Sequence, residues 1–180
     1  MEERFLASSL DRSAWRRTIA TLATLFAFLI LILLVRQIMP IVTLLVLPVI
    51  LAPALSFSTA PIGYRLSERE LTIDRKTLWS VHVPLSQITA CHPLPSTALR
   101  GAIRVYGTGG LFGWAGRYRS PELGTFAMHA TNLNHLVLIR RRRRKPVVIS
   151  PADTSAFIRG LQRQYETIQV APVREQPRVR

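Results

Sequence analysis

A charge-free apolar stretch near the start of the chain constrains its fold more than any other feature. Residues 18–35 and 38–57 contain no charged side chain, and only Arg36 and Gln37 interrupt them. A helix of 18 residues rises about 27 Å, which nearly matches a bilayer hydrocarbon core of about 30 Å. We therefore predict a two-span transmembrane hairpin over residues 18–57.

The second apolar run carries three prolines, Pro40, Pro48 and Pro53. Pro40 suits the first turn of a helix, whereas Pro48 is expected to remove a mid-helix hydrogen bond and kink the span. Three alternatives are a cleaved signal peptide, a hairpin buried in a soluble core, and a shallow re-entrant hairpin. The length of the first run argues against a signal peptide, and the lack of a polar face argues against a soluble core. The re-entrant hairpin stays open because Pro48 and Pro53 shorten the second helix.

Positive residues predict the orientation of the hairpin. Residues 1–17 contain four arginines, and residues 58–180 carry 19 of the 24 lysines and arginines. Cytoplasmic segments that flank membrane spans are enriched in these residues. We expect residues 1–17 to form a cytoplasmic N-terminal segment and the C terminus to be cytoplasmic as well.

The chain after the hairpin consists of short alternating segments, which are typical of half-buried strands. Trp79, Val81 and Val83 share one face, and residues 71–73 precede them across a polar turn, so this region predicts a β-hairpin. Four more strands are predicted at residues 102–106, 126–130, 136–139 and 147–149.

The period of the apolar residues changes after the last of these strands. Ser150 suits a helix cap, and Phe157 and Leu161 fall on one helical face. Several antiparallel strands followed by one amphipathic helix predict an α+β, mainly β domain over residues 58–165. Residues 166–180 show no apolar period, and we predict a disordered tail there.

An ordered set of short pieces runs through this domain. In chain order they are Tyr64 with the first hairpin, residues 84–88, the Gly-rich centre 104–124, residues 130–131, 136–139, 149–151 and 157–158. Together they resemble the bacterial pleckstrin-homology (PH) family over roughly residues 62–163. The resemblance implies an antiparallel sheet or barrel capped by the C-terminal helix, and a scaffold that binds lipid or protein. It transfers no catalytic residue. The two predicted spans, together with the resemblance to a bacterial family, lead us to expect a multi-pass protein of the bacterial inner membrane.

A run of six cations is the strongest candidate binding site. Its members are Arg140, Arg141, Arg142, Arg143, Arg144 and Lys145. The run lies between two predicted strands, so we expect it at a hairpin tip that meets anionic lipid headgroups. At about 1 kcal/mol per basic residue, the run contributes at most roughly 6 kcal/mol. Arg117 and Arg119 are expected to assist. The alternatives are a solvated loop and nucleic-acid binding, although no nucleic-acid motif accompanies the run.

The Gly-rich segment at residues 107–124 lacks the Gly-Lys-Ser/Thr ending of a phosphate-binding loop. We expect a twisted hairpin or a loop with aromatic contacts. Phe112 and Trp114 are candidate membrane-interface side chains, because amphipathic aromatics gather at that depth. Packing in the core is the commoner alternative for such residues.

The sequence contains no pattern of residues that indicates a catalytic or metal-binding site. A single cysteine excludes an intramolecular disulfide and a multi-cysteine metal site. The four histidines have no metal-ligand spacing, and the ten carboxylates present no matched acid–base pair. We predict that the protein is not an enzyme and has no metal, no cofactor and no small-molecule substrate.

The net charge favours anionic ligands near a membrane surface. It is +14 for the chain, of which residues 58–180 contribute +12, and the cytoplasmic leaflet is negatively charged. We predict a membrane-anchored PH-like interaction module that binds anionic lipid headgroups, a protein partner, or both. The alternative is an oligomeric scaffold or assembly subunit with no lipid-specific site. Nucleic acid is not an expected partner.

Overall fold

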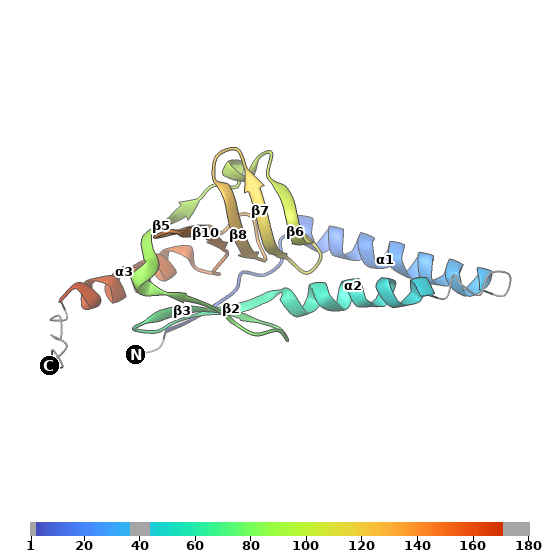
Figure 1. Cartoon of the computed structure of the whole chain (residues 1–180), viewed down its shortest axis with the longest axis horizontal. Helices are drawn as coiled ribbons and strands as arrows, with labels where there is room; N and C mark the ends of the chain where they lie inside the picture. Colours follow the sequence, from blue (N-terminus) through green and yellow to red (C-terminus); the bar gives the residue numbers. More distant parts are fainter. Residues whose placement is uncertain (1–2, 37–43, 171–180) are drawn as a thin grey trace, which may run out of the picture.

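A computed structural model describes residues 3–36 and 44–170 of the chain, with side chains up to residue 164. Two helices, α1 (Arg12–Val35) and α2 (Val46–Thr59), leave a sheet-rich domain side by side (Figure 1). The connection between the helices, including Pro40, and the last ten residues of the predicted tail lie outside the described residues.

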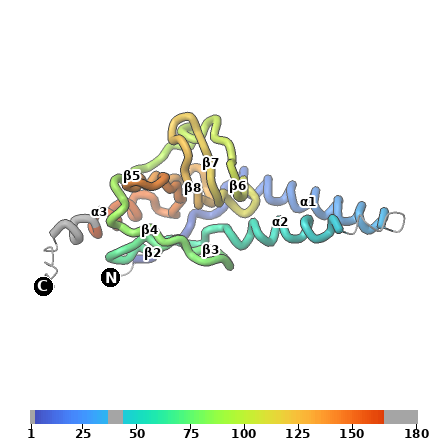
Figure 2. The backbone as a smooth tube through the Cα atoms, in the orientation of Figure 1, coloured from blue at the N-terminus to red at the C-terminus, as the bar shows by residue number. Residues whose placement is uncertain are grey.

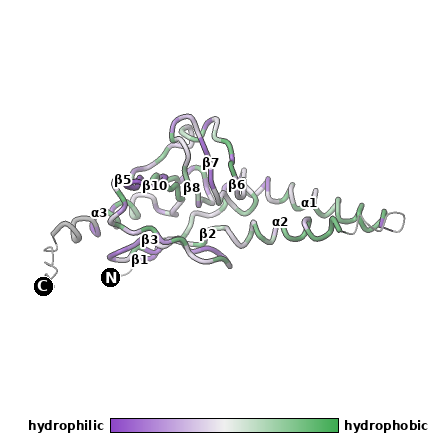
Figure 3. Tube along the Cα trace, in the orientation of Figure 1, coloured by the Kyte–Doolittle hydropathy of each residue, from purple (hydrophilic) through white to green (hydrophobic). Residues whose placement is uncertain are grey.

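Of the helices in the described residues, only α1 is long and apolar enough to cross a membrane. Helix α2 has 14 residues, which rise about 21 Å and fall short of a hydrocarbon core of about 30 Å. Helix α2 is largely apolar, and α1 is apolar after its first two turns, which carry Arg12, Arg16 and Arg17 (Figure 3). The structure therefore bears out one membrane-length helix of the predicted hairpin and a shorter apolar neighbour.

Pro48 does not lie in the middle of the second helix, so the predicted loss of a mid-helix hydrogen bond at this residue was wrong. Helix α2 begins after Leu45, which places Pro48 in its first turn. The backbone N–H groups of a first helical turn have no partner within the helix, so a proline there removes no hydrogen bond. Pro53 is the proline inside the helix.

The domain contains two sheets. The first has the order β1-β2-β3-β4 and is antiparallel throughout. Its strands are β1 (Glu3–Leu6), β2 (Pro61–Leu66), β3 (Glu70–Arg75) and β4 (Val81–Pro84). A short 3₁₀ helix, η2 (Leu85–Gln87), leads from this sheet into the second.

The second sheet has the order β5-β9-β10-β8-β7-β6. Its strands are β5 (Ile88–Leu94), β6 (Ile103–Gly109), β7 (Trp114–Ser120), β8 (Gly124–Ala130), β9 (Leu136–Arg141) and β10 (Arg144–Ile149), with η3 (Ser96–Leu99) between β5 and β6. The predicted antiparallel arrangement is confirmed except at one pair, because β10 runs parallel to β8. The four strands predicted beyond the first hairpin are confirmed.

Helix α3 (Thr154–Val170) closes the domain, as predicted. It extends five residues into the segment predicted as a tail. Phe157 and Leu161 are buried against the first sheet and against β9 and β10. The alternation of Trp79 with Val81 and Val83 misled the prediction, because β4 begins at Val81 and Trp79 is 87% exposed.

Strand β1, like β2 and β5, lies in a segment for which the sequence analysis predicted no strand. It pairs with β2 in the register Arg4↔Arg65 and Leu6↔Gly63, although the apolar hairpin separates the two strands in sequence. Figure 2 shows the N-terminal end of the trace beside β2. Residues 1–17 were predicted as a cytoplasmic segment outside the domain; the described part of them, up to the start of α1, belongs to its first sheet and its core.

Two contacts extend this attachment from β1 to the start of α1. The Ser8 N–H donates to the Ser150 carbonyl at 2.9 Å. Asp11 then caps α1, because its Oδ1 accepts from the Ala14 N–H at 2.7 Å while its Oδ2 accepts from the Leu133 N–H at 3.2 Å. Helix α1 therefore starts from a fixed point on the domain.

A close approach of β1 to α3 completes the packing. The Phe5 ring meets the Phe157 ring edge-on, with ring centroids 5.3 Å apart. A Cβ at Gly160 would lie 2.6 Å from Glu3 Oε2 and 3.1 Å from the Phe5 ring, so a larger residue there would require both side chains of β1 to shift. The N-terminal strand is thus held on one side by β2 and on another by the C-terminal helix.

We expect the substitution Phe5→Ala to lower the free energy of unfolding by about 1–3 kcal/mol, because it removes a half-buried ring from the core. Leu6→Ala is the matched control, since the Leu6 side chain is 76% exposed; it should change stability by about 0.5 kcal/mol or less. The measurement is guanidinium unfolding of the full chain in neutral detergent. Equal effects of the two substitutions would show that β1 does not pack as described.

Candidate functional site

The arginine run forms a hairpin tip, as predicted. Strand β9 ends at Arg141, β10 begins at Arg144, and the turn between them consists of Arg142 and Arg143. Arg143 has a φ of 56°, the left-handed conformation that such a tight turn requires. Five of the six side chains are exposed, and Arg141 is half-buried. We call the exposed arginines of this turn, Arg140, Arg142, Arg143 and Arg144, the arginine tip.

The arginine tip lies at the end of the domain away from α1 and α2. Strand β2 starts beside α2 and runs six residues, about 20 Å, before the turn that holds Arg69. The Arg69 carbonyl accepts from the Leu85 N–H at 2.9 Å, and the Gln87 carbonyl accepts from the Arg142 N–H at 2.6 Å. These two bonds connect the tip to the far end of the first sheet.

The helices are joined to the domain without a free linker. Helix α2 ends at Thr59 and β2 begins at Pro61, so only the buried Ala60 separates them. The Ala60 carbonyl accepts from the Lys76 N–H at 3.1 Å. The position of the tip relative to the helices is therefore set by the fold.

The two candidate interface aromatics have different environments. Trp114 is 5% exposed and packs in the core with Ala14 of α1, so the core-packing alternative describes it. Phe112 is half-buried at the base of the helices, where its ring lies 5.3 Å from that of Phe57. The Phe112 N–H donates to Thr18 Oγ1, 3.1 Å away. A membrane-interface role stays a prediction for Phe112.

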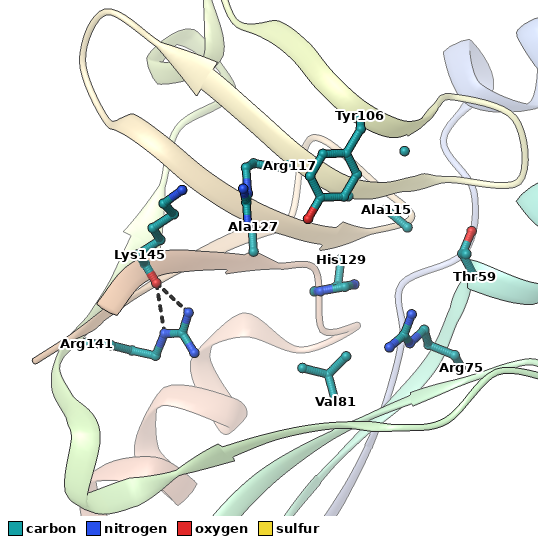
Figure 4. A pocket seen from close by; sticks show the side chains of 12 residues that line it. Thr59, Arg75, Val81, Tyr106, Ala115, Arg117, Ala127, His129, Arg141 and Lys145 are labelled. Atoms are coloured by element: carbon teal, nitrogen blue, oxygen red, sulfur yellow. Dashed lines mark hydrogen bonds between the residues drawn. The ribbon is translucent and has the colours of Figure 1, made fainter. Parts of the chain in front are cut away.

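A cleft of about 370 Å³ lies between the two sheets. We call it the inter-sheet cleft. Four cationic side chains from four different strands line it, namely Arg75, Arg117, Arg141 and Lys145. Figure 4 shows Arg141 and Lys145 at one end, His129 in the middle, and Arg75 and Thr59 at the other end. None of the residues that line it is acidic.

Two nitrogen atoms at the cleft are buried without a partner. Among the described residues, Arg75 Nε and His129 Nδ1 are the buried side-chain polar atoms that make no hydrogen bond. Such an atom costs about 1–3 kcal/mol when nothing replaces the water it has lost. Burial, together with the charges of Arg75 and Arg141, lowers the pKa of His129 to about 4, so its ring is neutral near pH 7.

The surrounding structure holds two of the cations in place. Arg141 donates from Nε and Nη2 to the Lys145 carbonyl, at 2.8 and 2.6 Å. The Arg117 guanidinium lies over the Tyr106 ring, 5.1 Å from its centroid. Burial lowers the pKa of Arg141, with a smaller contribution from Arg144, and burial also lowers that of Arg75.

A buried tyrosine fixes the backbone beneath His129. The Tyr64 hydroxyl donates to the His129 carbonyl at 2.8 Å and accepts from the Ser150 N–H at 3.1 Å. Burial raises the pKa of Tyr64 to about 12, so its hydroxyl keeps its proton and remains a donor at neutral pH. The first sheet thereby holds the strand that carries His129.

The cleft collects some of the predicted site residues and leaves out others. It brings Arg117, Arg141 and Lys145 together with Arg75 and His129, which the sequence analysis did not select. Arg119 lies outside it, in a shallow depression beside Ile103 and Pro121. The missed residues carry no local signal, because they lie far apart in the chain.

Comparison with known proteins gives one match. The family described as bacterial PH domain matches residues 62–165, close to the range over which the sequence resembles that family. No curated protein and no solved structure matches the chain.

The low pKa of His129 predicts a loss of stability in mild acid. Unfolded histidine binds a proton near pH 6.5, whereas folded His129 does so only near pH 4. The stabilisation is therefore present above pH 6.5 and is lost as the pH falls toward 4, by about 3 kcal/mol in total. Chemical unfolding of the full chain between pH 7 and pH 4 measures it.

The substitution His129→Gln should flatten this pH dependence, and His92→Gln should leave it unchanged because His92 is exposed. An unaltered slope in the His129→Gln protein would contradict the assignment.

Proposed function

The chain belongs to the bacterial PH domain family, and on this basis we propose that it is a membrane-anchored interaction module with its cationic domain at the cytoplasmic membrane surface. PH domains in general bind lipids or proteins. The single observation that carries the finer proposal is the position of the arginine tip, at the end of the domain opposite the apolar helices.

Exposed apolar side chains support the membrane anchor. Phe26 and Leu34 on α1 and Leu47 on α2 are 64%, 70% and 69% exposed. Continuous apolar surface of this extent is costly in water and is covered when a bilayer surrounds the helices. Helix α2 lies against α1, so α1 covers part of its apolar surface and the bilayer would cover the rest.

The two ends of the helical pair support a common side for both termini. Strand β1 precedes α1 and pairs with β2, which follows α2. The described N-terminal segment and the domain therefore share one side of the membrane. The arginines of residues 1–17 and the charge of the domain favour the cytoplasmic side.

The direction of the tip favours an acidic protein partner over the headgroups of the anchoring leaflet. With the helices in the bilayer, the fold directs Arg142 and Arg143 away from the membrane surface. Charges separated from that surface by more than the Debye length of about 8 Å are largely screened from it. A clustered cationic tip that faces the cytoplasm is suited to an acidic surface on another protein.

We expect polyglutamate to bind the full chain in neutral-lipid nanodiscs, with an affinity that falls as salt rises. The substitutions Arg142→Ser, Arg143→Ser and Arg144→Ser together should weaken this binding about tenfold, since each exposed pair contributes about 0.2–1 kcal/mol. The matched control is Arg100→Ser, Arg104→Ser and Arg159→Ser, which removes the same charge from exposed positions outside the tip.

If the control substitutions weaken polyglutamate binding equally, the binding depends on the net charge of the chain and not on the arginine tip. A second arm replaces polyglutamate by phosphatidylglycerol vesicles. Stronger, tip-dependent capture of those vesicles would overturn the protein-partner proposal in favour of headgroup binding. Self-association without either ligand would favour the scaffold alternative.

A further inference from the structure

We propose that the inter-sheet cleft binds a phosphoryl group, with Arg75 as its principal ligand, His129 beside it, and Arg141 contributing positive charge from the other end of the cleft. The site is separate from the arginine tip, because Arg142, Arg143 and Arg144 do not line the cleft. A negative result for the cleft would therefore not contradict the proposed role of the arginine tip, and a negative result for the tip would not contradict the cleft.

The first argument is uncompensated charge. Arg75 and Arg141 are half-buried cations, and no acidic residue lines the cleft they share. Buried charge without a counter-charge is costly. A bound anion would supply the missing negative charge.

The neighbouring carboxylates are already engaged elsewhere. Asp74 precedes Arg75 in β3, but its two oxygens accept from Arg65, at 2.7 and 2.8 Å. Glu70 on the same strand lies 3.0 Å from His82 Nδ1. The described structure therefore offers these cations no carboxylate of their own at the cleft.

The second argument is the pair of buried nitrogens without partners, Arg75 Nε and His129 Nδ1. His129 is 9% exposed, and its ring lies between Arg75 and Arg141 (Figure 4). A neutral imidazole carries one N–H, and the tautomer protonated at Nδ1 can donate it to an anion oxygen. Phosphoryl oxygens accept several hydrogen bonds at once, so one ligand can serve both nitrogens.

The kind of donor favours a phosphoryl group. Guanidinium groups present planar forks of N–H donors that match phosphate oxygens, and such charge-assisted bonds are about twice as strong as neutral ones. Arg141 is held by its two bonds to the Lys145 carbonyl, so it is already oriented before a ligand arrives. A volume of about 370 Å³ accommodates a phosphate ester with a small substituent.

The phosphoryl group can come from a free phosphate ester or from a lipid headgroup. Thr59, the last residue of α2, lines the cleft, so the cleft extends to the base of the apolar helices. A lipid phosphate at the membrane surface and a soluble phosphate would meet the same side chains. Their shared chemistry defines the site, and the experiment separates the two sources.

The test is calorimetric titration of the full chain in neutral detergent, with inorganic phosphate in one arm and short-chain phosphatidylglycerol in the other. We expect binding in at least one arm. Arg75→Gln should weaken it about tenfold to a hundredfold, as loss of a charge-assisted hydrogen bond does. Arg75→Lys, which keeps the charge, should retain more affinity. Arg119→Gln is the matched control on β7 outside the cleft and should bind as the native chain does.

Thermal unfolding of each variant checks that it folds. Lys145→Gln serves as a second test, because the exposed Lys145 side chain can change without loss of the core, and we expect severalfold weaker binding. Tighter binding of inorganic phosphate identifies a soluble ligand, and tighter binding of phosphatidylglycerol identifies a headgroup; both support the site. Absence of binding in both arms, or undiminished binding by folded Arg75→Gln and Lys145→Gln proteins, would overturn it.

Discussion

Strand β1 hydrogen-bonds to β2 although the apolar hairpin separates the two strands in the sequence. Because β1 and β2 belong to the same sheet, the apolar hairpin is an insertion between two strands of the domain and does not simply precede the domain. Phe5 reaches α3, and Asp11 both caps α1 and accepts from the Leu133 N–H. Both helices consequently leave the domain from fixed positions, and contacts between remote parts of the chain depend on a strand of four residues.

The fixed junction gives the domain two distinct ends. At the helix base, the β6–β7 turn contacts both helices, through Thr18 Oγ1 and through the Phe57 ring. At the other end, the Arg142 N–H donates to the Gln87 carbonyl and holds the arginine tip at the side of the domain away from the two helices. Between them, the inter-sheet cleft keeps Arg75 and Arg141 without a carboxylate partner. The cationic domain therefore has an exposed charge cluster and a partly buried one, which suit different ligands.

Local patterns predicted much of this fold and little of the site. Alternating side chains located β8, β9 and β10, and two apolar strands around the arginine run located its turn. The pattern failed at Trp79, because the alternation of side chains begins in exposed chain before the first residue of β4. Strand β1 is four residues long and has charged members, so only its distant partner reveals it. The cleft depends on the parallel pairing of β10 with β8, which brings His129 near Arg141 and which no local signal indicates.

The pairing of β1 with β2 is open to a direct measurement. Spin labels at Arg4→Cys and Arg65→Cys, in a Cys91→Ser chain reconstituted in nanodiscs, report the distance between the two strands. The register places these residues opposite each other, with Cα atoms about 5 Å apart, so strong dipolar broadening is expected. It should persist when the labelled chain is diluted with excess unlabelled chain, because the pairing is within one molecule. Absence of broadening, or its loss on dilution, would contradict an insertion of the hairpin within the domain.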